Sequence, residues 1–229
     1  MPSSTNAVAL VTGARCGIGR AIADALTVDG YRAVRVSRHI EESTSSDGIS
    51  LRCDVTNREE VHRAVALAMD HFGRIDVLVN SAGRSNLARI EELEPLVIEE
   101  LLAVNLLGAV HCAQEVLPVM RDLGGGAIIN IGSLRGKSCA PGKAAYSISK
   151  FAMRAFSLTL EREMAEEGIR VTLINPGFAQ TELIHHRIGE ECLRPEDLTQ
   201  PEDIANAVRF ALQLSPGAAL SELDIGRIW

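Results

Sequence analysis

Short apolar runs alternate with helix-length amphipathic stretches along most of this chain, and this alternation constrains the fold more than any other feature. The runs at 7–11, 33–36, 49–53, 76–80, 127–131 and 170–175 have the length and composition of buried strands. Between them lie segments such as IGRAIADALTVDG, TNREEVHRAVALAMDHFG and PLVIEELLAVNLLGAVHCAQEVLPVMRDLG. Strands that alternate with helices predict βαβ units with right-handed crossovers, and therefore an α/β fold with a parallel sheet.

The bulk properties of the chain predict a single globular domain. Its 229 residues suit one α/β domain over 1–229, and no linker is visible. A net charge of -7, the lack of a basic run and 3% aromatic residues argue against nucleic acid or an anionic membrane as a partner. We find no stretch long enough to cross a membrane and no signal-like N-terminus, so we expect a cytoplasmic protein. Five dispersed cysteines without C-x-x-C predict reduced thiols rather than a disulfide or zinc framework.

Two segments interrupt the periodic pattern. Residues 37–48 are polar and serine-rich and leave little room for a full helix. Residues 181–200 have mixed polarity and weak periodicity, and we interpret them as a substrate flap beside the site. The helix that follows the third strand is expected to begin from Thr56 or Asn57. PEDL and PEDI, around residue 200, are expected to mark two further helix starts.

A glycine-rich turn joins the first strand to the first helix. Glycine lets the backbone turn sharply and approach a ligand closely, and the helix directs free N–H groups at the turn, which suits a pyrophosphate. The spacing is G-x-x-x-G-x-G, not G-x-G-x-x-G, and the alternative is a turn packed tightly for structural reasons. The cofactor-binding candidates in this turn are Gly13, Arg15, Cys16, Gly17, Ile18 and Gly19.

The end of the second strand predicts which cofactor the chain prefers. Domains that bind NAD commonly place an acidic residue there for the ribose hydroxyls, but this chain has Ser37 followed by Arg38. A guanidinium attracts a 2′-phosphate that a carboxylate would repel, and Arg15 adds a second cation. We therefore expect NADP(H) in preference to NAD(H). The alternative is that Arg38 is a solvated surface charge.

The ends of the third and fourth strands carry further candidates. Asp54 would accept a hydrogen bond from the adenine amino group while Val55 packs on the ring, although Asp54 equally suits a helix cap. The motif NSAG supplies a small loop for close approach, at the strand end where open α/β sheets bind ligands. Its candidate residues are Asn80, Ala82 and Gly83.

The segment YSISK, at 146–150, combines a phenol and an ammonium at a spacing that places both on one helix face. A free tyrosine has a pKa of about 10, which is high for proton exchange at neutral pH. A nearby ammonium favours the phenolate and lowers that pKa. Ser133, just past the fifth strand, has a hydroxyl suited to holding a substrate oxygen. The alternative is a half-buried Tyr146 beside a Lys150 whose ammonium reaches solvent.

Taken together, these motifs resemble the short-chain dehydrogenase/reductase family in its compact single-domain form. TGARCGIG, CDV, NSAG, LLAVNLLG, IGS, YSISK and NPGFAQT occur in the order of that family, between Val8 and about Ala211. The resemblance implies a Rossmann-type, doubly wound parallel sheet. The C-terminal LSELDIGRIW departs from the VDGG-like ending that is common in the family.

The resemblance also implies a catalytic tetrad. Tyr146 would exchange a proton with the substrate oxygen, and Lys150 would lower the pKa of that phenol and bond the nicotinamide ribose. Ser133 would polarise the carbonyl, and Asn105 would distort its helix and hold a water that relays protons to Lys150. Pro176, Gly177 and Thr181 would cover the nicotinamide.

The implied activity is NADP(H)-dependent interconversion of a carbonyl and an alcohol on a small molecule, by a homodimer or homotetramer. The alternatives are an NAD(H)-dependent dehydrogenase of the same family and a non-catalytic sensor of the cofactor. We expect no metal at the adjacent His185 and His186. Arg187, Arg84 and Arg135 are each either a partner for a substrate carboxylate or a surface charge.

Overall fold

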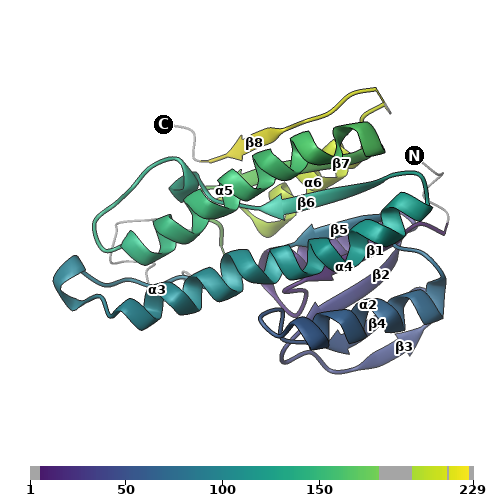
Figure 1. Cartoon of the computed structure of the whole chain (residues 1–229), viewed down its shortest axis with the longest axis horizontal. Helices are drawn as coiled ribbons and strands as arrows, with labels where there is room; N and C mark the ends of the chain where they lie inside the picture. Colours follow the sequence, from purple (N-terminus) through teal and green to yellow (C-terminus); the bar gives the residue numbers. More distant parts are fainter. Residues whose placement is uncertain (1–5, 181–197, 216, 227–229) are drawn as a thin grey trace.

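The computed structural model describes residues 6–180, 198–215 and 217–226, which form a sheet covered by helices on both faces (Figure 1). The strand order is β3-β4-β2-β1-β5-β6-β7-β8, and neighbouring strands are parallel except for β3 with β4. The strands are β1 (Val8–Thr12), β2 (Arg32–Ser37), β3 (Ser43–Ser45), β4 (Gly48–Arg52), β5 (Val77–Asn80), β6 (Gly126–Ile131), β7 (Ile169–Pro176) and β8 (Glu222–Ile225). The helices are α1 (Gly17–Val28), α2 (Arg58–Phe72), α3 (Pro95–Leu102), α4 (Gly108–Asp122), α5 (Ala144–Met164) and α6 (Pro201–Gln213).

The chain winds outward from β1 in two directions, which confirms the expected Rossmann-type, doubly wound sheet. It first builds β2 and β4 on one side of β1 and then returns to build β5, β6 and β7 on the other. The direction reverses between β1 and β5, the switch point at which open α/β sheets bind ligands. Helices α2, α4 and α5 cover one face, and α1 and α6 cover the other, each over its own apolar core (Figure 1).

The central strands are buried on both faces, which explains why they could be recognised as continuous apolar runs. All residues of β1 are buried. Its register sets Val8 opposite Arg32 on β2 and Ala9 opposite Val77 on β5. This pairing brings the carboxyl ends of the three strands to one edge of the sheet.

The edge strands β3 and β8 were not expected from the sequence. Strand β3 is three exposed residues paired antiparallel to β4, and it lies in the segment 37–48, where the expectation of no full helix is confirmed. Strand β8 pairs with β7 at the edge of the sheet formed by the described residues, and its burial pattern is half-buried. Strand β3 is short and polar, so backbone pairing defines it. Strand β8 is also short, but its Leu223 and Ile225 pack against the core.

The helix starts resolve two alternatives left open by the sequence. Asn57 caps α2, because its Oδ1 accepts from the amides of Glu59 and Glu60 at 3.0 and 3.3 Å. Asp54 is therefore not the cap, and its Oδ1 instead accepts from the amide and hydroxyl of Thr56. PEDI begins α6, whereas most of PEDL lies outside the described residues.

One helical segment corrects the expectation that no stretch could cross a membrane. Residues 95–122, which include α3, the π-helical turn Ala103–Leu107 and α4, are long and apolar enough by length and composition. A core helix of a soluble protein passes the same test. Here α4 packs on the sheet beside α2, and its side chains Cys112, Val116 and Met120 belong to the core.

Candidate active site

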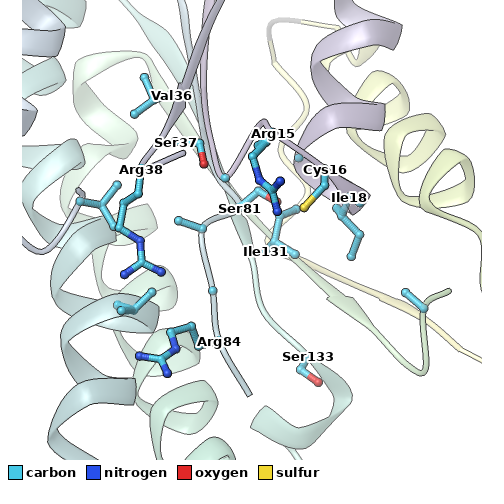
Figure 2. A pocket seen from close by; sticks show the side chains of 18 of the residues that line it. Arg15, Cys16, Ile18, Val36, Ser37, Arg38, Ser81, Arg84, Ile131 and Ser133 are labelled. Atoms are coloured by element: carbon cyan, nitrogen blue, oxygen red, sulfur yellow. The ribbon is translucent and has the colours of Figure 1, made fainter. Parts of the chain in front are cut away.

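A cavity of about 360 Å³ opens at the carboxyl edge of the parallel sheet (Figure 2). It begins at the turn after β1 and extends past the ends of β2, β5, β6 and β7 to helix α5. Its wall contains Gly13, Arg15, Cys16, Gly17, Ile18, Gly19, Ser37, Arg38, Asp54, Val55, Ala82, Gly83, Ser133, Tyr146, Lys150, Pro176 and Gly177. Residues predicted from separate motifs thus face one space.

The glycine turn is packed so closely that side chains would not fit. Gly13 has a φ of +67°, and a Cβ there would lie 2.9 Å from Cα of Ala82. A Cβ on Gly19 would lie 2.5 Å from the carbonyl oxygen of Gly13. Thr12 fastens the neighbouring loop, since its Oγ1 accepts from the amides of Ser81 and Ala82, both at 3.0 Å. These glycines therefore serve tight packing, which was the structural alternative, and the same turn also lines the cavity.

The N-terminus of α1 has the properties of an anion site. The Cys16 side chain makes no capping hydrogen bond to the helix amides, and the first turn contains no acidic residue. Helix α2 differs, because Asn57 caps it and Glu59 and Glu60 stand in its first turn. The α1 amides and the positive end of the helix dipole thus face the cavity without an internal counter-charge from this turn, and they fit a pyrophosphate.

Two arginines extend into this cavity from different elements. Figure 2 shows Arg15 on the glycine turn and Arg38 at the end of β2. Nη1 of Arg38 lies 3.8 Å from Oδ2 of Asp54, and both side chains are partly exposed. Arg38 is thus a cavity residue with a carboxylate beside it, rather than a charge pointing only to solvent.

Ser133 and Tyr146, both predicted as catalytic residues, line the same cavity. Ser133 caps a short 3₁₀ turn, Leu134–Gly136, and its Oγ accepts from the Arg135 amide at 3.1 Å. Burial raises the pKa of the Tyr146 phenol above its usual value. A side-chain hydrogen bond with Ser133 and the charge of Arg135 act in the opposite direction and lower that pKa. The Ser133 hydroxyl donates to the carbonyl oxygen of Pro176 at 3.4 Å.

Lys150 lies on the same helix as Tyr146, and its expected lowering of the Tyr146 pKa stays a prediction. Its Nζ is buried, donates to the carbonyl oxygen of Ile131 at 2.9 Å, and lies 5.8 Å from the centroid of the Tyr146 ring. Burial lowers the pKa of Lys150 to about 8. Desolvation is thus the largest effect on the pKa values of both Tyr146 and Lys150, and the spacing of these residues along a helix does not predict it.

Lys143, which lies one helical turn before Tyr146 in PGKAAY, has its Nζ 5.7 Å from the centroid of the Tyr146 ring and was not identified from the sequence.

Asn105 lies behind the cavity wall, within the π-helical turn of residues 103–107, and the predicted distortion of its helix is confirmed. Its Oδ1 accepts from the Arg84 amide at 2.7 Å, and its Nδ2 donates to the Arg84 carbonyl and to Oγ of Ser149, both at 2.9 Å. The side chain therefore ties the loop after β5 to α5. Both amide hydrogens have protein partners, so the water expected there has no free donor on this side chain.

Comparison with known proteins identifies the family. The model of the short chain dehydrogenase family matches residues 7–191. This chain belongs to the short-chain dehydrogenase family. An uncharacterized oxidoreductase of Staphylococcus aureus strain USA300 is 33% identical over 96% of this chain and 97% of its own length. A Staphylococcus saprophyticus oxidoreductase, also uncharacterized, is 34% identical over 95% and 96%.

Solved structures of this family share the fold along nearly the whole chain. A 3-ketoacyl-(acyl-carrier-protein) reductase from Brucella melitensis, complexed with NADH, has a TM-score of 0.89 and 25% identity, with 98% of both chains covered. ElxO with NADP bound has a TM-score of 0.87 and 27% identity, covering 96% of this chain and 97% of that one. The sheet on which the motifs of this chain lie is therefore shared with these solved structures.

The remaining predicted residues differ in how they relate to the cavity wall of this short-chain dehydrogenase. Asn80 is buried in β5, where its Nδ2 donates to Oδ1 of Asn130 at 2.9 Å. Arg84 lines the cavity with Nη1 3.4 Å from Oε2 of Glu100, whereas Arg135 stands over the ring of Phe178. Thr181, His185, His186 and Arg187, with most of the predicted flap, lie outside the described residues.

The sequence analysis did not single out other wall residues, most of which lie inside the quoted motifs beside the chosen candidates. They include Val36, His39, Cys53, Ser81, Val104, Ile131, Gly132 and Ala179. The signal that could have identified them is their position, because all but Val104 lie at or near the end of a strand that carries a motif. Over residues 6–180, 198–215 and 217–226, no group of three or more His, Cys, Asp or Glu side chains could hold a metal ion.

Proposed function

We propose that this protein is an NADP(H)-dependent oxidoreductase that interconverts a ketone or aldehyde and the corresponding alcohol. One observation carries the proposal. The Ser133–Tyr146 pair and the buried Lys150 share a single cavity with the N-terminus of α1, whose amides and helix dipole fit a pyrophosphate.

In the proposed reaction the nicotinamide, when bound, supplies or accepts the hydride at the carbonyl carbon. The protein handles the proton and the orientation. In reduction the Tyr146 phenol donates its proton to the carbonyl oxygen, which becomes the alcohol hydroxyl, and Ser133 holds that oxygen by a hydrogen bond. In oxidation the phenolate of Tyr146 removes the proton from the alcohol.

The buried state of Tyr146 suits the role of acid. Because burial raises its pKa, the phenol keeps its proton at neutral pH and can donate it. Ser133 and Arg135 stabilise the phenolate that remains after donation. These opposing effects support a group that can both give up and recover a proton.

The arginines favour NADP(H) as the cofactor. Arg38 and Arg15 line one end of the cavity and offer guanidinium groups to a 2′-phosphate. The alternative, NAD(H), is supported by Asp54, whose carboxylate lies 3.8 Å from Arg38. The solved neighbours include one complexed with NADH and one with NADP bound. A cofactor sensor would need neither Tyr146 nor Ser133, so their pairing favours an enzyme.

The direct test is NADPH oxidation by the purified protein with ketones, aldehydes, diketones, quinones and keto acids, with NADH in parallel. Carbonyl-dependent turnover with a preference for NADPH supports the proposal. Tight NADPH binding without turnover of any class would favour the sensor instead. Turnover with NADH alone would favour the NAD(H) alternative.

We also propose that the protein is a cytoplasmic homodimer or homotetramer acting on a small molecule. Exposed apolar side chains on α5 and on the long helical segment beside it support a contact between subunits: Leu107, Ile148 and Phe151. Sedimentation of the purified protein measures the oligomeric state.

A further inference from the structure

Strand β8 carries two carboxylates that join a polar network behind the active site. Glu222 receives the Arg154 guanidinium through two hydrogen bonds, at 2.9 and 3.0 Å. Nζ of Lys137 lies 3.1 Å from Oε1 of Glu222 and donates to Asp224 at 2.8 Å. This strand belongs to the C-terminal segment LSELDIGRIW, which departs from the VDGG-like ending of the family.

The network reaches the catalytic turn through Asn175 at the end of β7. Nδ2 of Asn175 donates to Oε1 of Glu222 at 2.7 Å and to Oδ1 of Asp224 at 2.9 Å. Ionised carboxylates only accept hydrogen bonds, so they fix which end of the amide faces β8. Oδ1 of Asn175 must then face the other way, where it accepts from the Ser133 amide at 3.2 Å.

Two further contacts connect β8 to the same turn. Lys137, which the carboxylates hold, directly follows the 3₁₀ turn capped by Ser133. Leu134, next to Ser133, packs against the end of β8, since a Cβ built on Gly226 would lie 2.9 Å from its Cδ1. Contacts with β8 and the residue after it thus reach the turn at both of its ends.

We propose that Glu222 is a positioning residue that acts through Asn175 and Lys137 to set the Ser133 hydroxyl against the Tyr146 phenol. This inference rests on the proposed function, in which that pair moves the proton. Glu222 does not itself line the cavity. The hydrogen bonds from Arg154, Lys137 and Asn175 lower the pKa of Glu222 to about 2, so its carboxylate stays ionised at the pH of any assay near neutrality.

The test compares Glu222→Ala with Glu222→Gln. Both remove the charge, but glutamine keeps an oxygen that can accept from Asn175, so the difference between them reports the link to Ser133 and not the charge. Asp29→Asn is the control, because it breaks a paired carboxylate of similar geometry, with Arg209, on the opposite face of the sheet.

The first readout needs no substrate. The chain has two tyrosines, so a Tyr31→Phe background leaves Tyr146 as the only phenol, and ¹³C-tyrosine NMR titrates it alone. Loss of the Ser133 hydrogen bond removes an effect that lowers the pKa of Tyr146. We therefore expect a higher Tyr146 pKa in Glu222→Ala than in Glu222→Gln, with Asp29→Asn unchanged.

The second readout is NADPH oxidation with 2,3-butanedione as the carbonyl probe. We expect Glu222→Ala to lose about tenfold or more in kcat, because small misplacements of a catalytic group are costly, while the KM for NADPH stays within about twofold. Glu222→Gln should recover part of the loss. Thermal unfolding of each variant separates loss of folding from loss of positioning.

The two proposals fail in different ways. If the wild-type protein oxidises no NADPH with any carbonyl, the proposed function loses its support, and the Tyr146 titration alone still decides the role of Glu222. If Glu222→Ala and Glu222→Gln give the same Tyr146 pKa as the control, the positioning role is overturned, whatever the turnover.

Discussion

Nζ of Lys150 lies 2.9 Å from the carbonyl oxygen of Ile131, so a buried ammonium on α5 is fastened to the end of β6. It is held by a backbone dipole rather than by a carboxylate. Burial lowers its pKa to about 8, which shows that the folded protein holds this charge at a cost. An active site that stores an unfavourable charge is expected to trade stability for function.

Lys150→Met should therefore stabilise the protein near neutral pH. The folded pKa of about 8 lies below the ordinary lysine value of 10.5, a difference worth up to about 3 kcal/mol below pH 8, less the lost hydrogen bond to Ile131. The unfolded chain binds this proton more tightly, so the stability of the wild type rises from pH 8 to 10.5. The difference in the free energy of unfolding between Lys150→Met and wild type should therefore become smaller from pH 8 to 10.5. Urea unfolding at pH 7 and pH 9.5 measures it, and a variant less stable than wild type at pH 7 would contradict the argument.

Gly19→Ala should weaken both folding and cofactor binding. A Cβ at this position would lie 2.5 Å from the Gly13 carbonyl oxygen, so the glycine turn must shift. We expect a loss of about 1–3 kcal/mol in the free energy of unfolding, as for other overpacked sites, together with weaker NADPH binding. Gly217→Ala is the matched control, because nothing lies within 4 Å of its added Cβ. Equal behaviour of the two variants would show that the turn tolerates side chains.

Asn105→Ala should cost more stability than Ser149→Ala. The first change leaves the amide and carbonyl of Arg84 without their side-chain partner, whereas the second removes a hydroxyl that bonds Asn105 and the Tyr146 carbonyl. Each buried group left unsatisfied costs about 1–3 kcal/mol. Chemical denaturation of both variants gives the order, and a smaller loss for Asn105→Ala would mean that water replaces its bonds.

Arg38 and Asp54 should affect the two cofactors differently. Arg38→Ala should weaken NADPH binding by about tenfold or more and leave NADH binding nearly unchanged, because a charge-assisted bond to the 2′-phosphate is lost. Asp54→Asn keeps the Oδ1 that Thr56 uses but removes the carboxylate beside Arg38, so it should favour NADPH over NADH. Fluorescence titration measures both affinities. Arg20→Ala, a solvent-exposed cation, is the control, and equal losses for both cofactors in Arg38→Ala would exclude selection by this residue.

The central sheet and the outline of the site could be predicted because their signals are local. Strands such as β1 are apolar throughout, and the glycine turn, Ser133, Tyr146 and Lys150 sit at strand ends or on one helix face. The topology of a parallel sheet then brings them to one edge. Asn57 could likewise be identified as a candidate cap from its position alone.

The remaining features depend on burial and on contacts distant in sequence. The raised pKa of Tyr146 and the lowered pKa of Lys150 follow from desolvation, which no spacing rule measures. The link from Glu222 to Asn175 joins residues 47 positions apart, and β8 itself, with four residues, is too short to be recognised as a strand. Such features can be identified only from the folded structure.

The most direct measurement compares wild type and Tyr146→Phe for both NADPH binding and NADPH-dependent carbonyl reduction. Phenylalanine keeps the ring but removes the proton donor. The account predicts an NADPH dissociation constant within about twofold of wild type and a fall in turnover of about a thousandfold, within the range of general acid catalysis. Turnover by Tyr146→Phe within a few-fold of wild type would contradict the central claim that this phenol carries the proton.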